Sequence, residues 1–147
     1  MRAIVVFDGD CGLCNGFVAW LLRRDRDGRF LIAGSAGDAG RAVLESAGLG
    51  VHVAGSTIVV WDGSEALTRT DALIRIAHGL PWPWRLAGTM RWAPRSLRDR
   101  VYDAVARRRP RRPAEDPACG TPPRDLVGLW RSRLASVDDV AALASPT

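Results

Sequence analysis

Two cysteines separated by two residues, Cys11 and Cys14, are the side chains of this chain best suited to chemistry. They follow the apolar run 3–7 and stand where a helical pattern begins. A helix N-terminus offers unpaired backbone N–H groups and partial positive charge, so it stabilises a thiolate. We therefore expect Cys11 to be the exposed nucleophile and Cys14, one turn further along, to be the sheltered resolving thiol. The spacing predicts a redox-active dithiol.

Two aspartates, Asp8 and Asp10, stand directly before this motif. Asp10 precedes Cys11 directly, where its charge opposes thiolate formation, and it is the expected N-cap of the helix. Because the intervening Gly12-Leu13 adds no positive charge, we expect a reductase or a moderately reducing exchange site. Asp8 closes the apolar run, and two roles stay open for it: a proton relay for Cys14, or a structural cap of the helix or of the turn at Gly9.

A zinc site would use the same cysteines differently. Cys11 and Cys14 would be completed by Cys119 and by His52 or His78, giving a zinc-stabilised basic binding module. The chain has no second Cys-x-x-Cys and no His-x-x-x-His, which favours the redox interpretation. Cys119 alone is either a third thiol near the pair or an inert loop cysteine.

The segment 4–10 also fits the first motif of haloacid-dehalogenase-like phosphatases. There Asp8 would be the nucleophile and Asp10 the acid/base, bridged by magnesium. Such a site needs a basic residue for the phosphate and a later acidic pair for the metal. The chain has no Lys, and its acidic pair 138–139 stands close to the C-terminus without a preceding strand.

Composition narrows the class of protein. With 147 residues, 47% of them hydrophobic, the chain can bury a core, and three cysteines are too few for a disulfide-rich secreted scaffold. We see no signal peptide and no run long enough to span a membrane, so we expect a cytoplasmic protein. Residues 1–80 hold 8 Arg against 9 acidic residues, and residues 81–147 hold 13 against 7. We expect no nucleic-acid partner, and at most a weak membrane-surface contact through the Trp- and Arg-rich segment 82–92.

The periodicity of the N-terminal part predicts an α/β fold. Alternating short apolar runs and amphipathic segments give the order βαβαββα, which is typical of a thioredoxin-like fold with a mixed four-stranded sheet flanked by helices. Thr70 or Asp71 is the expected cap of the last helix. The expected strands are 3–7, 30–33, 57–61 and 65–68, and the expected helices are 12–24, 38–47 and 70–78.

A change of composition after Gly79 divides the chain. We expect a thioredoxin-like core at 1–79 and a helical, Pro- and Arg-rich C-terminal extension at 80–147, packed together as one compact domain. A helix is expected at 95–109, an irregular stretch at 110–125, and a capping box at Ser136 before a short last helix. An apolar stripe should be buried against the core and bring the long helix to the dithiol end. It comprises Trp84, Leu86, Leu97, Val101 and Val105.

With these residues in hand, the chain resembles the DCC family of thiol–disulfide oxidoreductases, named for an Asp-x-x-Cys-x-x-Cys motif. The block 5–15 fits that signature almost residue for residue, 71–77 resembles its mid-chain helix, and 97–107 its long C-terminal helix. Cys119 and Pro122 resemble its late Cys-x-x-Pro segment.

The resemblance implies a thioredoxin-like fold and disulfide exchange through Cys11 and Cys14, with no organic cofactor. We expect no metal at the site, and as partners a disulfide-containing protein or a small thiol substrate and an upstream thiol reductant. Three features depart from the pattern: Thr70 replaces Ser, 108–110 reads Arg-Arg-Pro, and Gly55-Ser56-Thr57 stands where many thioredoxin folds have a cis-proline facing the dithiol.

Overall fold

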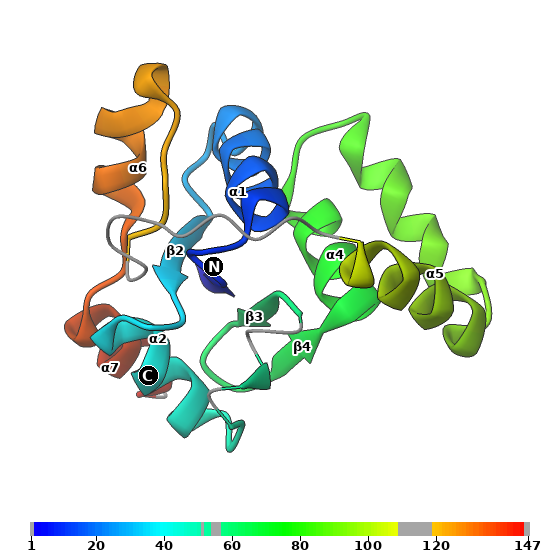
Figure 1. The fold of residues 1–147 in the computed structure, drawn as a ribbon, viewed down its shortest axis with the longest axis horizontal. Coiled ribbons are helices and arrows are strands. Elements are labelled where there is room, and N and C mark those ends of the chain that lie inside the picture. The colour runs from blue at the N-terminus through cyan, green and yellow to red at the C-terminus, as the bar shows by residue number, and fades with distance from the viewer. Residues whose placement is uncertain (1, 51, 54–56, 109–118, 146–147) are drawn as a thin grey trace.

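Four strands form one mixed sheet in the order β2-β1-β3-β4 (Figure 1). The central strand β1 (Ala3–Phe7) pairs parallel with β2 (Phe30–Gly34) and antiparallel with β3 (Val59–Trp61). The edge strand β4 (Ala66–Thr68) pairs antiparallel with β3. This confirms the thioredoxin-like fold. The computed structural model describes residues 2–50, 52–53, 57–108 and 119–145.

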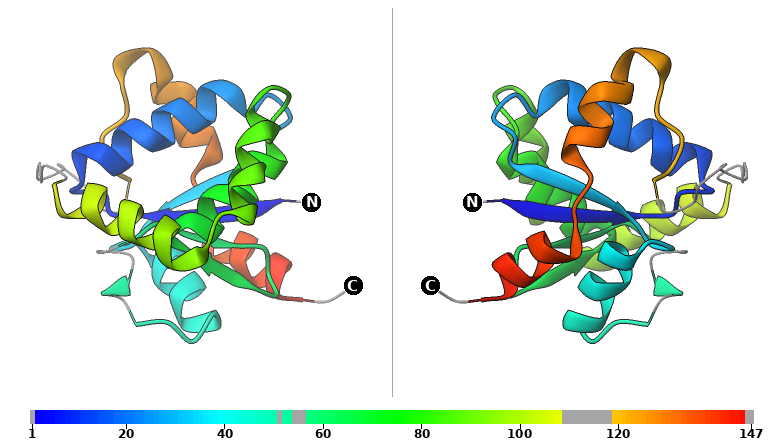
Figure 2. Two further views of the ribbon diagram at one scale, coloured as in Figure 1. Left: turned by 90° about the vertical axis from the view of Figure 1, so that its right-hand side faces the viewer. Right: turned by 90° about the vertical axis from the view of Figure 1, so that its left-hand side faces the viewer.

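Helices cover both faces of the sheet (Figure 2). On one face lie α1 (Gly12–Arg24), α4 (Arg69–Gly79) and α6 (Val127–Arg133). On the other lie α2 (Asp38–Ser46) and α7 (Val137–Ala144), which pack against each other. The sheet is therefore the middle layer of three.

The residues of β1 explain why this strand is central. Val5 and Phe7 point into the core shared with α1 and α6, while Ile4 and Val6 point into the core shared with α2 and α7. These four side chains are fully buried. A strand covered on both faces needs a continuous apolar run rather than an alternating one, and the run at 3–7 supplies it.

The start of α4 differs from its prediction. The helix begins at Arg69 with Thr68 at the N-cap, so neither Thr70 nor Asp71 caps it. Both side chains bond instead to α5 (Arg95–Arg107). The Thr70 hydroxyl donates to Asp99 at 2.9 Å, and Arg95 donates to Asp71 at 2.6 Å. They serve to attach the long C-terminal helix.

The apolar stripe expected to be buried is largely exposed. Leu97, Val101 and Val105 are 56%, 60% and 53% exposed, and Leu86 and Trp84 are exposed as well. That prediction was wrong because α5 is held to α4 by polar contacts, including the ion pair of Arg69 and Asp103 at 3.6 Å. The apolar side chains of α5 line an open groove instead.

Other parts of residues 80–147 do enter the core. Leu126 and Trp130 join the cluster with β1 and α1, and Val140 joins the cluster with α2. The capping box is confirmed: the Asp139 amide donates to the Ser136 hydroxyl, and Ser136 donates to the Asp139 carboxylate. Three elements were not predicted: η1 (Trp84–Trp92), η2 (Arg124–Leu126) and α6.

Residues 110–118 of the stretch expected to be irregular lie outside the described residues, as does the expected end of the long helix at Arg109. Among the residues that are described, no helix is long and apolar enough to cross a membrane.

Candidate dithiol site

Cys11 is the N-cap of α1, and Cys14 lies in the helix's first turn. The Cys14 backbone N–H donates to the Cys11 Sγ at 3.3 Å, and the Asn15 N–H donates to the Cys11 carbonyl at 3.0 Å. Cys11 thus takes the N-cap place expected for Asp10. A sulfur that accepts a bond from a helix N-terminal N–H is held where negative charge is stabilised.

A tight turn explains why Asp10 is not the cap. Asp8 is buried, its Oδ1 accepts from the Asp10 N–H at 3.0 Å, and its carbonyl accepts from the Cys11 N–H at 3.1 Å. The turn therefore ends one residue later than expected, and Cys11 enters the helix. These bonds agree with the structural role left open for Asp8, in which it closes the turn at Gly9.

The two thiols do not divide into one exposed and one sheltered. Cys11 is 0% and Cys14 5% exposed, so the expectation of an exposed Cys11 is wrong. Both thiols lie in apolar surroundings, in the same buried cluster as Phe7, Val18 and Trp130. Cys14 borders the open groove along α5, whereas Cys11 does not line it.

Asn15, which the sequence did not single out, ties the site to the C-terminal segment. Its side-chain amide donates to the carbonyls of Gly9 at 2.8 Å and Cys11 at 3.0 Å. Its Oδ1 accepts from the Thr121 N–H at 2.9 Å. An asparagine side chain competes with backbone hydrogen bonding inside a helix. Its presence at the start of α1 was therefore the sequence signal that Asn15 bonds to nearby backbone groups.

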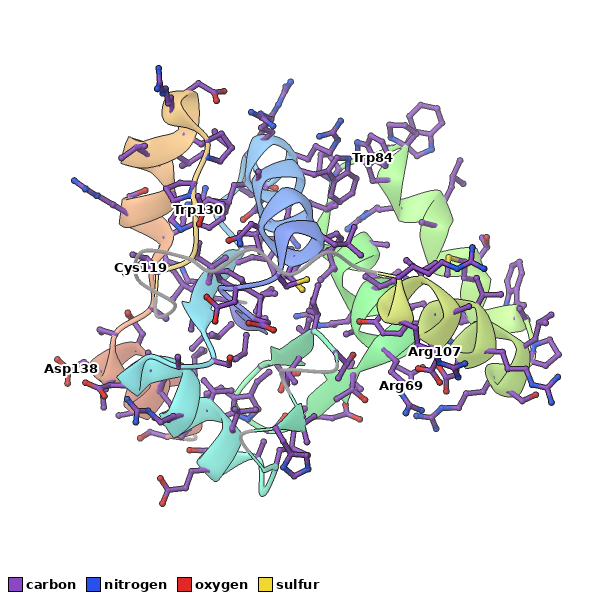
Figure 3. All side chains as sticks on the ribbon, viewed as in Figure 1. Arg69, Trp84, Arg107, Cys119, Trp130 and Asp138 are labelled. Atoms are coloured by element: carbon purple, nitrogen blue, oxygen red, sulfur yellow. The ribbon has the colours of Figure 1, made fainter. Side chains whose placement is uncertain are left out.

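The segment that carries Cys119 runs beside α1 on its α6 side, opposite Trp84 (Figure 3). The Trp130 indole donates to the Cys119 carbonyl at 2.7 Å, and the Trp130 ring meets Phe7 edge to face at 5.9 Å. Gly120 has φ +73°, and a Cβ there would lie 2.5 Å from the Asn15 Oδ1. The chain approaches so closely that only glycine fits.

On the other side, α5 reaches the start of β3. The Tyr102 hydroxyl accepts from the Ile58 N–H at 3.2 Å and from the Thr57 hydroxyl at 3.0 Å. Thr57 Oγ1 also accepts from the Arg69 N–H at 2.9 Å. A side chain of α5 therefore occupies the main-chain N–H at this position. Gly55 and Ser56, beside it, lie outside the described residues.

The groupings needed for a metal do not form within the described part of the chain. No three His, Cys, Asp or Glu side chains gather there so as to hold an ion. Gly88 packs close to the imidazole of His78, and Asp139 is engaged in the capping box of α7. Among these residues, neither the zinc set nor the phosphatase set, the two alternatives to the redox interpretation, is assembled.

The Trp- and Arg-rich segment is partly packed and partly open. Arg24 lies over the rings of Trp20 and Trp84, which meet edge to face at 5.0 Å. Trp82 and Trp92 are 74% and 76% exposed.

Comparison with known proteins adds independent evidence on the family of this chain. The family model described as DCC1-like thiol-disulfide oxidoreductase matches residues 5–114. The chain is 33% identical over 106 residues to the uncharacterized protein YuxK of Bacillus subtilis, covering 72% of this chain and 77% of that protein. It is 31% identical over 110 residues to a chloroplastic DCC family protein of Arabidopsis thaliana, covering 74% of this chain and 63% of that one. It thus spans less than two thirds of the Arabidopsis protein. No solved structure matches.

Proposed function

Since the chain belongs to the DCC1-like thiol-disulfide oxidoreductase family, we propose that Cys11 and Cys14 form its redox couple and reduce disulfides in polypeptide or small-thiol substrates. The observation that carries this proposal is the bond from the Cys14 N–H to the Cys11 Sγ at 3.3 Å. It supports Cys11 as the thiolate and attacking sulfur, because the helix N-terminus stabilises negative charge there.

The reaction balances with these two residues. The Cys11 thiolate attacks one sulfur of the substrate disulfide, forms a mixed disulfide and releases the other substrate sulfur as a thiolate. The Cys14 thiolate then attacks the Cys11 sulfur, which closes the Cys11–Cys14 disulfide and releases the second substrate thiolate. Two electrons pass to the substrate, whose thiolates take up two protons. A dithiol reductant must later reverse the process on the protein.

Asp8 is proposed as the proton relay for Cys14 within this scheme. Its carboxylate is buried and belongs to the turn that leads into Cys11. A carboxylate close to the motif in sequence can accept the thiol proton when Cys14 becomes the attacking sulfur.

The test is disulfide reduction with three cysteine variants. Insulin reduction by Cys11→Ser should be abolished, Cys14→Ser should accumulate a mixed disulfide with substrate, and Cys119→Ser should keep its activity. The same variants show which thiol is alkylated first, and we expect Cys11. Full activity in Cys11→Ser, or much faster alkylation of Cys14, would contradict the assigned roles.

A further inference from the structure

A groove of about 490 Å³ runs from the dithiol along α5. Cys14 and Phe17 of α1 form one wall, and Leu97, Val101 and Val105 of α5 form the other. Leu13, between the two cysteines, is 45% exposed at its edge. Because a thiol of the couple borders the groove, any occupant lies against the dithiol. Cys11 is fully buried and does not line the groove, so the groove reaches the pair at Cys14.

The lining of the groove selects against a charged occupant. Arg98 is the charged residue among the lining side chains, and its guanidinium is already engaged. It donates to Asp71 at 3.3 Å, to Thr70 at 3.3 Å and to the Ala93 carbonyl at 3.2 Å. A small charged thiol such as glutathione would therefore find no unengaged charge inside the groove. An occupant with apolar side chains would instead displace water from the apolar lining, which is favourable.

The exposed surface of α5 also carries positive charge. Arg100 and Arg107 are exposed, and within the described part of the chain neither makes an ion pair, while Asp99 and Asp103 are engaged with Arg95 and Arg69. An occupant that carries acidic residues beside its apolar ones would complement this charge.

Main-chain docking at the start of β3 is blocked on the same side. The Ile58 N–H is bonded to Tyr102, as described above. An incoming polypeptide cannot bond to that main-chain donor while the Tyr102 hydroxyl occupies it. Among the residues that the structure describes, the side chains of the groove are what is left for recognition on this side of the dithiol.

We propose that this groove is the docking surface for an apolar segment, flanked by acidic residues, of a disulfide-bearing polypeptide. The proposal rests on the proposed function of Cys11 and Cys14 and specifies its substrate class. The docked segment holds the substrate disulfide beside Cys14; for the exchange described above, docking must also uncover the buried Cys11 sulfur.

The test uses the reduced full-length protein in single turnovers, so that no added reductant is needed. Three synthetic peptides each carry one intramolecular disulfide: a Leu-Val-Leu flank with two Glu, the same flank with two Lys, and a Ser-Gln-Ser flank with two Glu. Hydroxyethyl disulfide, too small to fill the groove, reports the chemistry alone. The measured quantity is the second-order rate constant for oxidation of the Cys11–Cys14 pair.

For the wild type we expect the apolar acidic peptide to react at least about tenfold faster than the Ser-Gln-Ser peptide, the discrimination that burial of an apolar side chain supplies. It should also react faster than the Lys-flanked peptide, by a factor that declines with added salt. The double variant Leu97→Gln, Val101→Gln should lose most of this preference and keep the wild-type rate with hydroxyethyl disulfide. The matched control is Val137→Gln, at a valine on α7 that is 50% exposed, and it should keep both.

Equal rates for all peptides, with the dithiol still oxidised by them, would overturn the docking proposal and leave the redox function standing. No oxidation by any disulfide, hydroxyethyl disulfide included, would instead refute the redox function. A wild-type dimer that the double variant dissociates, with no change in peptide preference, would assign the groove to a second copy of the chain and also overturn the proposal.

Discussion

Replacing Asn15 by alanine should destabilise the protein by an amount that its three side-chain hydrogen bonds determine. The residue is 8% exposed, and its amide joins Gly9, Cys11 and Thr121 at 2.8, 3.0 and 2.9 Å. The Cys11 carbonyl keeps a second donor, the Asn15 N–H, after the substitution. The Gly9 carbonyl and the Thr121 N–H lose the partner that Asn15 provides.

A hydrogen bond contributes about 1 kcal/mol net, and a buried group left unsatisfied costs about 1–3 kcal/mol. Two lost partners and one weakened contact therefore give a loss of about 2–3 kcal/mol in the free energy of unfolding. Urea denaturation followed by circular dichroism measures this quantity. The control is Ser132→Ala on α6, an exposed residue whose hydroxyl bonds only within its own turn, and its effect should stay within about 0.5 kcal/mol.

The same variant should expose the dithiol, because Thr121 and the Cys119 segment lose their attachment to α1. Alkylation of Cys11 should then be faster than in the wild type. An Asn15→Ala protein as stable as the Ser132→Ala control would refute the reasoning, because it would mean that these bonds do not hold the C-terminal segment at the site.

Three further predictions concern residues around the site and in the scaffold. Asp8→Asn should slow disulfide turnover at neutral pH by about tenfold or more while the melting temperature changes little, and unchanged rates from pH 6 to 9 would leave Asp8 a turn residue only. Arg133→Ala should lower the free energy of unfolding, measured by urea denaturation, by about 3 kcal/mol, because the buried carboxylate of Asp25 loses the guanidinium that contacts it at 2.7 Å; a loss below about 1 kcal/mol would contradict this. Ser136→Ala should cost about 1 kcal/mol at pH 7. The Asp139 pKa is lowered first by the backbone N–H of Ser136, which alanine keeps, and then by the Ser136 hydroxyl, which alanine lacks. Part of the difference should therefore disappear as pH falls below the ordinary value of 3.8, because the hydroxyl's bond to the carboxylate loses its strength when Asp139 is protonated; a constant difference down to pH 2 would count against it.

The sequence predicted the elements that carry the dithiol because their signals are local. The apolar run of β1 and the helical spacing of α1 lie within the elements themselves, and the observed bounds Ala3–Phe7 and Gly12–Arg24 agree with the expected 3–7 and 12–24. The N-cap was misplaced by one residue, because the bond from the Asp10 N–H to Asp8 depends on the exact form of the turn.

Features that depend on distant contacts were not predictable in this way. The amphipathic pattern of α5 shows that one face is apolar. Whether that face is buried or lines an open groove depends on where Thr70 and Asp71 attach the helix. Likewise α6 is a seven-residue helix, and the importance of Trp130 is visible only when Phe7 and the Cys119 carbonyl lie against it.

The reduction potential of the Cys11–Cys14 pair tests the redox function most directly. The protein would be equilibrated in buffers of graded glutathione and glutathione disulfide, quenched with an alkylating agent and analysed by mass spectrometry of peptides containing each cysteine. We expect Cys11 and Cys14 to lose alkylation together in one two-electron transition, between about −200 and −270 mV, the range of moderately reducing dithiols. Full alkylation of both cysteines in every buffer, or a disulfide that pairs either of them with Cys119 instead, would contradict the proposed couple.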